Sequence, residues 1–137
     1  KDLLKNLKKL GIGCIAFSPL AQGMMSSKYL NTIPKDSRAN QSSSLDKKHI
    51  TNSYIKKILG LSKIAKKRNQ TIPQLAISWV LRHKTMTSAL IGTRNVKQLN
   101  ECLDSLKNLE FSKSELKSIN KYAKEEKINL WETSSSY

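Results

Sequence analysis

The order of apolar and polar residues predicts a helix and then a buried strand at the start of the chain. Within residues 1–10 the leucines recur at helical spacing, and Gly11 stands where a C-terminal cap belongs. Residues 12–17 form a short apolar run without polar alternation, which is typical of a strand buried on both faces. The leucines of the helical stripe are Leu3, Leu4, Leu7 and Leu10.

Residues 21–53 lose this periodicity and are expected to form a long loop. They contain Gly23, Pro34 and a stretch rich in serine and asparagine around residues 40–44. Loops of this length inside compact domains are often functional or mobile.

Two helices are expected after the loop. The first spans residues 53–68, with Asp46 or Thr51 as its N-cap, and carries a broad apolar arc among lysines. The second has Pro73 in its first turn, where no amide donor is needed. Its apolar residues share one helical face, and this places Trp79 in the core.

The last part of the chain predicts one more strand and two more helices. Residues 86–91 indicate the strand, and the helices begin near Asn95 and at a capping box formed by Ser112 and Glu115. The first of these helices is expected to turn inward Val96, Leu99, Leu103 and Leu106. The second is expected to bury Leu116, Ile119 and Ala123. A polar tail with Trp131 follows.

This order predicts an α/β fold with two parallel strands. Helices separate the strands, so the strands cannot be hairpin partners. Strands this apolar need neighbours on both edges and helices on both faces, because their backbone groups otherwise stay unpaired. The length permits at most one domain. Since the chain also starts at Lys1 rather than at methionine, residues 1–137 are expected to be part of a larger α/β domain, such as a (β/α)₈ barrel.

The charge balance raises nucleic-acid binding as an alternative. The chain has 25 Lys and Arg against 10 Asp and Glu, a net charge of +15, and such a field attracts polyanions. Only four of the basic residues are arginine, the usual base-reading residue, and the lysines are spread evenly. Solvated lysines are therefore the favoured interpretation, and nucleic acid is not the expected partner.

The apolar runs and the cysteines indicate the cellular compartment of the protein. The apolar runs are too short for a membrane span of roughly 20 residues. Cys14 and Cys102 lie far apart without a metal or redox spacing, which suits a reducing cytosol. A cytoplasmic protein is expected.

Candidate chemistry lies at the two strand ends, where α/β enzymes place their sites. The segment 17–23 puts a hydroxyl and several main-chain groups beyond the first strand. After the second strand, Arg94 precedes a helix N-terminus that favours an anion, and Gln98 and Glu101 share a face of that helix. A phosphate with a nearby sugar or purine would suit this set. The alternative is that Asn95 only caps the helix and that Arg94 is solvated.

Catalytic residues are not evident. His49 lies in the long loop and His83 at a helix end, and no Ser/His/Asp order, metal spacing or paired carboxylate occurs. Both histidines are expected to be solvated or packed.

Several segments resemble the C-terminal part of the aldo-keto reductases. They are Gly11-Ile-Gly-Cys-Ile-Ala-Phe-Ser-Pro-Leu-Ala-Gln-Gly23, Lys28-Tyr29-Leu30, Ile33-Pro34-Lys35-Asp36-Ser37-Arg38, Leu90-Ile91-Gly92-Thr93-Arg94 and Gln98-Leu99-Asn100-Glu101. Within the family they are most similar to the branch that holds bacterial L-glyceraldehyde 3-phosphate reductases and the β subunits of voltage-gated potassium channels. The ending Ile128-Asn129-Leu130-Trp131 resembles the bacterial reductases, which argues against a channel-bound interaction subunit.

The resemblance implies strands seven and eight of a (β/α)₈ barrel that binds NADP(H). By match, the nicotinamide and ribose side would be lined by Phe17, Ser18, Pro19 and Leu20. The pyrophosphate would be held by Ala21, Gln22, Lys28 and Arg38. The adenosine end would be held by Gly92, Arg94, Gln98 and Glu101, with Arg94 near the 2′-phosphate. Cys102 stands where the family usually has an adenine-contacting asparagine, which would weaken that contact.

The resemblance also implies what this chain lacks. The family's catalytic Asp, Tyr, Lys and His come from earlier strands, so no residue here inherits a catalytic role. The chain alone is expected to be inactive and to act on a small carbonyl substrate only within a complete protein. An opened barrel exposes apolar faces, so self-association or pairing with the N-terminal half is expected.

Overall fold

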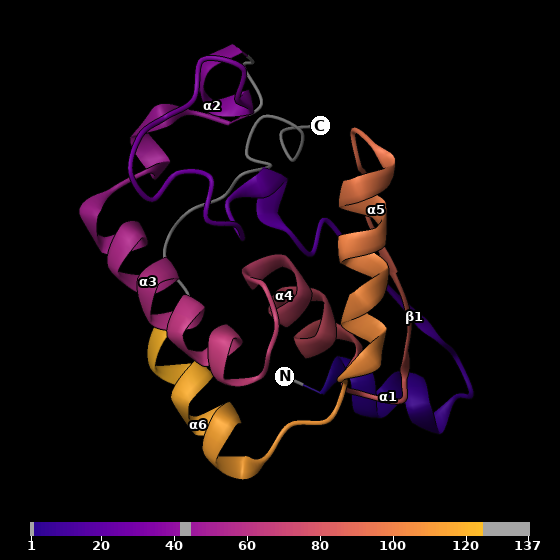
Figure 1. Cartoon of the computed structure of the whole chain (residues 1–137). Helices are drawn as coiled ribbons and strands as arrows, with labels where there is room; N and C mark the ends of the chain where they lie inside the picture. Colours follow the sequence, from indigo (N-terminus) through magenta and orange to yellow (C-terminus); the bar gives the residue numbers. More distant parts are fainter. Residues whose placement is uncertain (1, 42–44, 125–137) are drawn as a thin grey trace.

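The computed structural model describes residues 2–41 and 45–124 and confirms the predicted order of elements (Figure 1). The helices and strands are α1 (Leu3–Lys9), β1 (Cys14–Phe17), α2 (Arg38–Gln41), α3 (Asn52–Lys67), α4 (Ile72–Leu81), β2 (Met86–Leu90), α5 (Val96–Leu103) and α6 (Lys113–Tyr122). Short 3₁₀ turns are η1 (Ala21–Gly23), η2 (Lys47–His49) and η3 (Asp104–Lys107). The tail with Trp131 lies outside the described residues.

β1 and β2 pair in parallel, as predicted, with Phe17 opposite Leu90. The expectation that the first strand is buried on both faces is wrong for this chain. Ile15 and Phe17 are 67% and 65% exposed, whereas their neighbours in the strand are half-buried. Successive side chains of a strand point to opposite faces, and the described elements cover only one of them.

Side-chain caps begin the three longer core helices. Thr51 accepts a hydrogen bond from the Tyr54 amide and caps α3, whereas Asp46, the other candidate, caps η2. Reciprocal capping boxes open α4 at Thr71 and α6 at Ser112. Each cap satisfies amide donors that the first helical turn leaves without partners.

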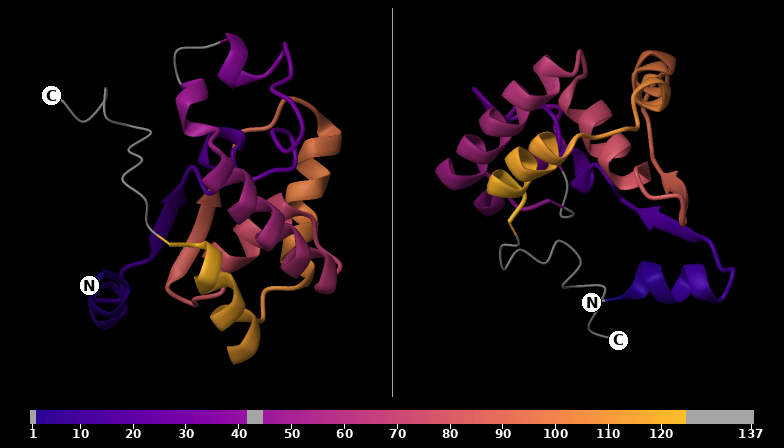
Figure 2. Two further views of the ribbon diagram at one scale, coloured as in Figure 1. Left: turned by 90° about the vertical axis from the view of Figure 1, so that its left-hand side faces the viewer. Right: turned by 90° about the horizontal axis from the view of Figure 1, so that it is seen from below.

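α1 ends at Gly11 in a Schellman arrangement. Gly11 has φ +67° and its amide bonds to the Lys8 carbonyl, while the Ile12 amide bonds to the Leu7 carbonyl. This left-handed conformation suits glycine because it has no Cβ. None of the residues of α1 is buried, and the helix stands apart from the helical body (Figure 2).

The core lies between α3, α4, α6 and the long loop. Its buried members include Ile58, Leu61, Ile64, Leu75 and Ile119. Residues 18–50 form the expected long loop, which is interrupted by short helices. Four of its residues are buried in the hydrophobic core and so hold the loop against the helices. These are Met24, Tyr29, Ala39 and Leu45.

Tyr54 ties this loop to α3. Its hydroxyl donates to the Met24 carbonyl at 2.6 Å, and burial raises the pKa of the phenol far above its ordinary value. The predicted core position of Trp79 holds only in part, because Trp79 is half-buried and packs against the edge of the core.

The predicted inward face of α5 is wrong. Its apolar side chains are 39% to 70% exposed, and Cys102 is the residue of α5 that is buried. α5 contacts α4 and η3 with its other side, so the apolar stripe faces outward. The stripe consists of Val96, Leu99, Leu103 and, in η3, Leu106. In α6, Ile119 is buried as expected, Leu116 is half-buried and Ala123 is exposed.

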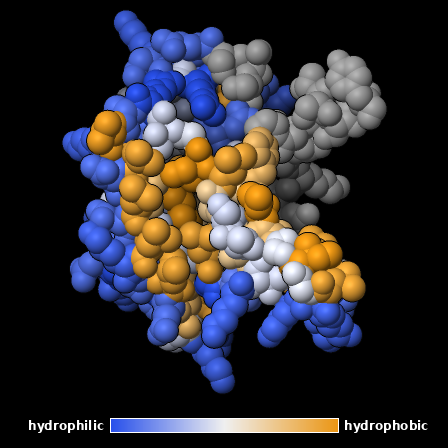
Figure 3. All heavy atoms as spheres, turned by 90° about the vertical axis from the view of Figure 1, so that its right-hand side faces the viewer, coloured by the Kyte–Doolittle hydropathy of each residue, from blue (hydrophilic) through white to orange (hydrophobic). Residues whose placement is uncertain are grey.

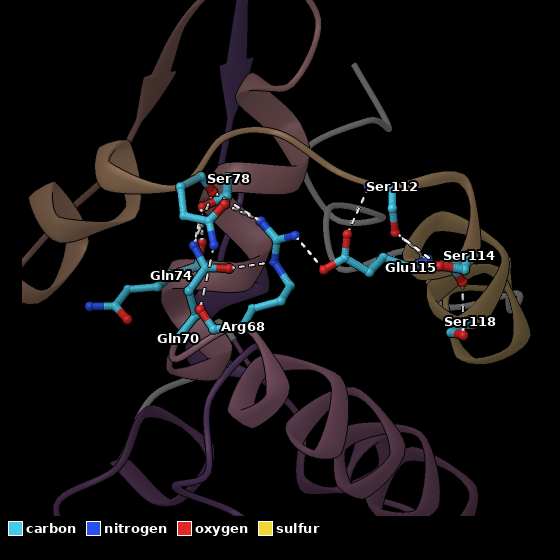
Figure 4. Close-up of polar contacts among 9 residues, drawn as sticks. Arg68, Gln70, Gln74, Ser78, Ser112, Ser114, Glu115 and Ser118 are labelled. Atoms are coloured by element: carbon cyan, nitrogen blue, oxygen red, sulfur yellow. Dashed lines mark hydrogen bonds and ion pairs between the residues drawn. The ribbon is translucent and has the colours of Figure 1, made fainter.

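A buried arginine joins the helices of the core (Figure 4). The Arg68 side chain is 3% exposed and donates to Glu115 Oε1 at 2.7 Å and to Gln70 Oε1 at 2.8 Å. It also donates to the Asn108 carbonyl at 3.0 Å and stacks 3.8 Å from the centre of the Phe111 ring. One side chain thus connects the end of α3 with the segment before α6.

Candidate functional site

A pocket of about 410 Å³ opens at the carboxyl ends of β1 and β2. It brings together ten of the twelve residues that the sequence nominated. After β1, these are Ser18, Pro19, Leu20 and Gln22, with Lys28 and Arg38 from the loop. After β2, they are Gly92, Arg94, Gln98 and Glu101. Parallel strands end at the same edge of a sheet, which explains why two segments so far apart in sequence meet here.

Phe17 and Ala21 are the two nominated residues that do not line the pocket. Phe17 is the last residue of β1 and its side chain lies on the exposed face of the strand. Ala21 packs against the hydrophobic core from the loop side. The alternation of side chains along the strand and the turn after it direct both away from the pocket.

The turn after β1 holds an unusual run of left-handed residues. Ser18, Ala21 and Gln22 have φ of 53°, 45° and 56°, and Gly23 has φ of 93°. A non-glycine residue in this region costs on the order of 1–3 kcal/mol, and such strain gathers at ligand-binding sites. Three of these residues, Ser18, Gln22 and Gly23, border the pocket.

Gln22 borders the pocket and is 6% exposed. Its Oε1 atom is buried without a hydrogen-bond partner among the described residues. A buried acceptor without a partner is costly.

At the second strand end the structure shows both an Asn95 cap and an exposed Arg94, as each of the two interpretations requires. Asn95 caps α5, since its side chain accepts from the Gln98 amide at 2.9 Å. Arg94 is exposed, yet its Nη1 donates to the Asp36 carbonyl at 3.2 Å, and its amide donates to Gln98 Oε1 at 3.0 Å. Arg94 therefore links the long loop to the start of α5.

The charges around the pocket favour an anion. Three cations, Lys28, Arg38 and Arg94, border it, against one carboxylate, Glu101. A phosphate placed there would be attracted by the cations and by the N-terminus of α5. The pocket is mixed in character, because Pro19, Leu20 and other apolar residues also line it.

Sequence reasoning missed part of the lining. The buried Tyr29 and the start of α4, Thr71 to Pro73, also border the pocket. Cys102, which the resemblance already placed at the adenine end, lies there as well. Burial, followed by the charge of Glu101, raises the pKa of its thiol, so the thiol stays neutral. The start of α4 follows no strand, and only tertiary packing brings it to this edge.

The two histidines, His49 and His83, do not line the pocket. Burial, helped by the charge of Arg82, lowers the pKa of His83. The described part of the chain holds no group of three potential metal ligands. None of its helices is long and apolar enough to cross a membrane.

Comparison with known proteins identifies the family to which the chain belongs. The sequence model of the aldo/keto reductase family matches residues 1–124, and the chain belongs to this family. L-glyceraldehyde 3-phosphate reductase of Escherichia coli O157:H7 is 41% identical over 137 residues, 97% of this chain and 40% of that protein. The protein of the same name in strain K12 is 42% identical over the same shares.

The chain therefore spans about 40% of the length of the curated relatives it matches. The α/β structure with two parallel strands, each followed by helices, is consistent with part of a (β/α)₈ barrel.

Proposed function

We propose that the pocket binds NADP(H) and that residues 1–137 form the C-terminal, cofactor-binding part of an aldo-keto reductase domain. β1 and β2 would be strands seven and eight of its barrel. The observation that carries this proposal is the convergence of ten nominated residues, from segments 18–38 and 92–101, on one pocket. Aldo-keto reductases generally use NADP(H), and the excess of cations fits its phosphates.

The residues present fit this cofactor. Lys28 and Arg38 would hold the pyrophosphate, and Arg94 the 2′-phosphate beside the N-terminus of α5. Gln98 and Glu101 would contact the adenosine end, and Gln22, which also borders the pocket, would lie on the pyrophosphate side. Ser18, Pro19 and Leu20 would border the nicotinamide. Phe17 and Ala21, which the resemblance also assigns to the cofactor, do not line the pocket.

The reaction would be reduction of a small carbonyl compound, to which bound NADPH supplies hydride. This chain would bind and orient the cofactor, and the start of α4 and the long loop would shield it from water. The proton donor would come from the part of the fold that this chain does not include. We therefore expect the isolated chain to be inactive. The relatives' name makes a phosphorylated aldehyde such as L-glyceraldehyde 3-phosphate the first substrate to test.

A chimeric enzyme tests the assignment. This chain would replace the matched stretch of the Escherichia coli (strain K12) reductase, and cofactor binding would be followed by fluorescence. Charge-assisted contacts contribute about 1.5–3 kcal/mol, so Arg94→Ala should raise the dissociation constant for NADPH about tenfold to a hundredfold and change that for NADH little. Arg38→Ala should weaken both cofactors alike.

Lys97→Ala is the matched control, because Lys97 is an exposed cation of the same helix that does not line the pocket. It should leave both dissociation constants unchanged. Equal losses of NADPH and NADH binding in Arg94→Ala would contradict the assignment of Arg94 to the 2′-phosphate. A chimera that folds but binds neither cofactor would contradict the proposed function as a whole.

A further inference from the structure

Gln74, in the first turn of α4, uses both polar atoms of its side-chain amide. Its Oε1 accepts from the Thr71 amide at 2.8 Å, as part of the capping box. Its Nε2 donates to the Glu101 carbonyl of α5 at 3.1 Å. A rotated amide would place a donor against the Thr71 donor and an acceptor against the Glu101 carbonyl. The two partners therefore fix the orientation of the side chain.

The two partners of Gln74 belong to two segments that line the pocket. Residues 71–73 line it from the start of α4, and Glu101 and Cys102 line it from α5. Gln74 is half-buried and does not line the pocket itself. It therefore joins two parts of the lining without bordering the cavity.

Within this chain, α5 is held from the side of α4. The helix contacts α4 and η3, and Cys102 is the residue of α5 that is buried. The other side of α5 carries Val96, Leu99 and Leu103, which the described residues leave exposed. Figure 3 shows apolar side chains gathered on this side of the molecule. The bond from Gln74 is the only hydrogen bond between α4 and α5 in the described part of the chain.

The place of the Glu101 carbonyl gives this bond its leverage. It lies in the last turn of α5, where carbonyl oxygens lack partners within the helix and accept from other donors. The eight residues of α5 span only about 12 Å, so fixing one end of the helix also fixes the other. Gln98 lies one turn before Glu101, and its Oε1 accepts from the Arg94 amide. The side chains that α5 brings to the pocket therefore move with the helix.

We propose that Gln74 is a positioning residue for the adenosine end of the cofactor. It holds α5, and with it Gln98 and Glu101, in place against the start of α4. Gln74 acts through the position of α5 and not by touching the cofactor. This rests on the proposed function, because it takes α5 to bind the adenosine end.

Ser78 provides a comparison, because it ties α4 to η3 away from the pocket. Its hydroxyl donates to the Ser105 carbonyl at 2.9 Å and accepts from Gln70 Nε2 at 2.8 Å (Figure 4). Neither Ser78 nor these two partners line the pocket. Ser78→Ala should therefore lower Tm without weakening cofactor binding.

Two variants of Gln74 in the chimeric enzyme separate its two hydrogen bonds. Gln74→Glu still accepts from the Thr71 amide, as glutamate does in capping boxes, but it has no donor for the Glu101 carbonyl. Gln74→Met loses both bonds and adds no charge. Gln74→Met should lower Tm, whereas Gln74→Glu should change it little.

Fluorescence and calorimetric titrations measure the binding of NADPH and of adenosine 2′,5′-bisphosphate, a probe for the adenosine end alone. Both Gln74 variants should raise both dissociation constants about twofold to tenfold, as expected for one hydrogen bond. Ser78→Ala should leave both constants unchanged. A loss of binding that does not follow the loss of Tm is the result that a merely structural role would not produce.

Four outcomes overturn the positioning role. They are unchanged binding in both Gln74 variants, a loss in Gln74→Glu alone, which its added charge would cause, a loss in Gln74→Met alone, which the missing cap would cause, and an equal loss in Ser78→Ala. In each of these the unchanged chimera still binds NADPH, so the proposed function stands. A folded chimera that binds neither NADPH nor the bisphosphate contradicts the proposed function, and the positioning role falls with it.

Discussion

Arg68→Ala should destabilise the chain by about 3 kcal/mol. The side chain is 3% exposed. Its loss would remove the ion pair with Glu115 and the hydrogen bond to Gln70 (Figure 4), together with the stacking on Phe111. Removing one partner of a buried ion pair costs about 3–5 kcal/mol. The lower end applies because Glu115 is 31% exposed and water can solvate it in the variant. Gln70 and the Asn108 carbonyl would also lose a donor.

Urea unfolding followed by circular dichroism measures this loss. A 3 kcal/mol change corresponds to a fall of about 10 °C in Tm for a chain of this size. Arg68→Lys should lose less, because it keeps the charge but cannot reach Glu115, Gln70 and Asn108 at once. A double-mutant cycle with Glu115→Ala should give a coupling energy of about 1–3 kcal/mol.

Lys67→Ala is the control for Arg68→Ala, because Lys67 is the adjacent cation and is exposed. It should change the free energy of unfolding by less than about 0.5 kcal/mol. If Arg68→Ala changes it by no more than this control, the reasoning is refuted, and the network in Figure 4 contributes nothing to stability.

Three further predictions concern the same helical core. Burial alone would raise the pKa of Glu115, but hydrogen bonds from the Ser112 amide and Arg68 outweigh it and lower the pKa below the usual 4.5. The contribution of Glu115 to the free energy of unfolding should therefore be fully present above about pH 4.5 and be lost as the pH drops through the folded-state pKa. In urea unfolding, Glu115→Gln should make the midpoint depend less on pH. Gly60→Ala should destabilise by about 1–3 kcal/mol, because the new Cβ would overlap the Tyr122 ring; Tyr122→Leu in the same chain should restore part of the loss in Tm. Tyr54→Phe should cost about 1–2 kcal/mol, because the Met24 carbonyl loses its donor, and it should speed limited proteolysis within residues 24–37.

Sequence reasoning determined the local structure well. Thr51, one of the two caps named for α3, and the Asn95 and Ser112 caps all form, as does the glycine-terminated end of α1. Caps and periodicity act over three or four residues, so they can be read without the fold. The parallel pairing of the strands followed from their order, since helices separate them.

Only the tertiary structure decided which faces are covered and which side chains meet. The same apolar spacing that predicts an inward face on α5 also describes a stripe that points outward, because periodicity marks a face but not its neighbour. Arg68 meets Glu115 across 47 positions, and Arg94 reaches Asp36 across 58. Such contacts depend on how whole elements pack. The sequence by itself therefore determined the elements and the residues at the strand ends. Packing alone decided which pocket these residues line, that Arg68 is buried among the core helices, and that the apolar side of α5 stays exposed.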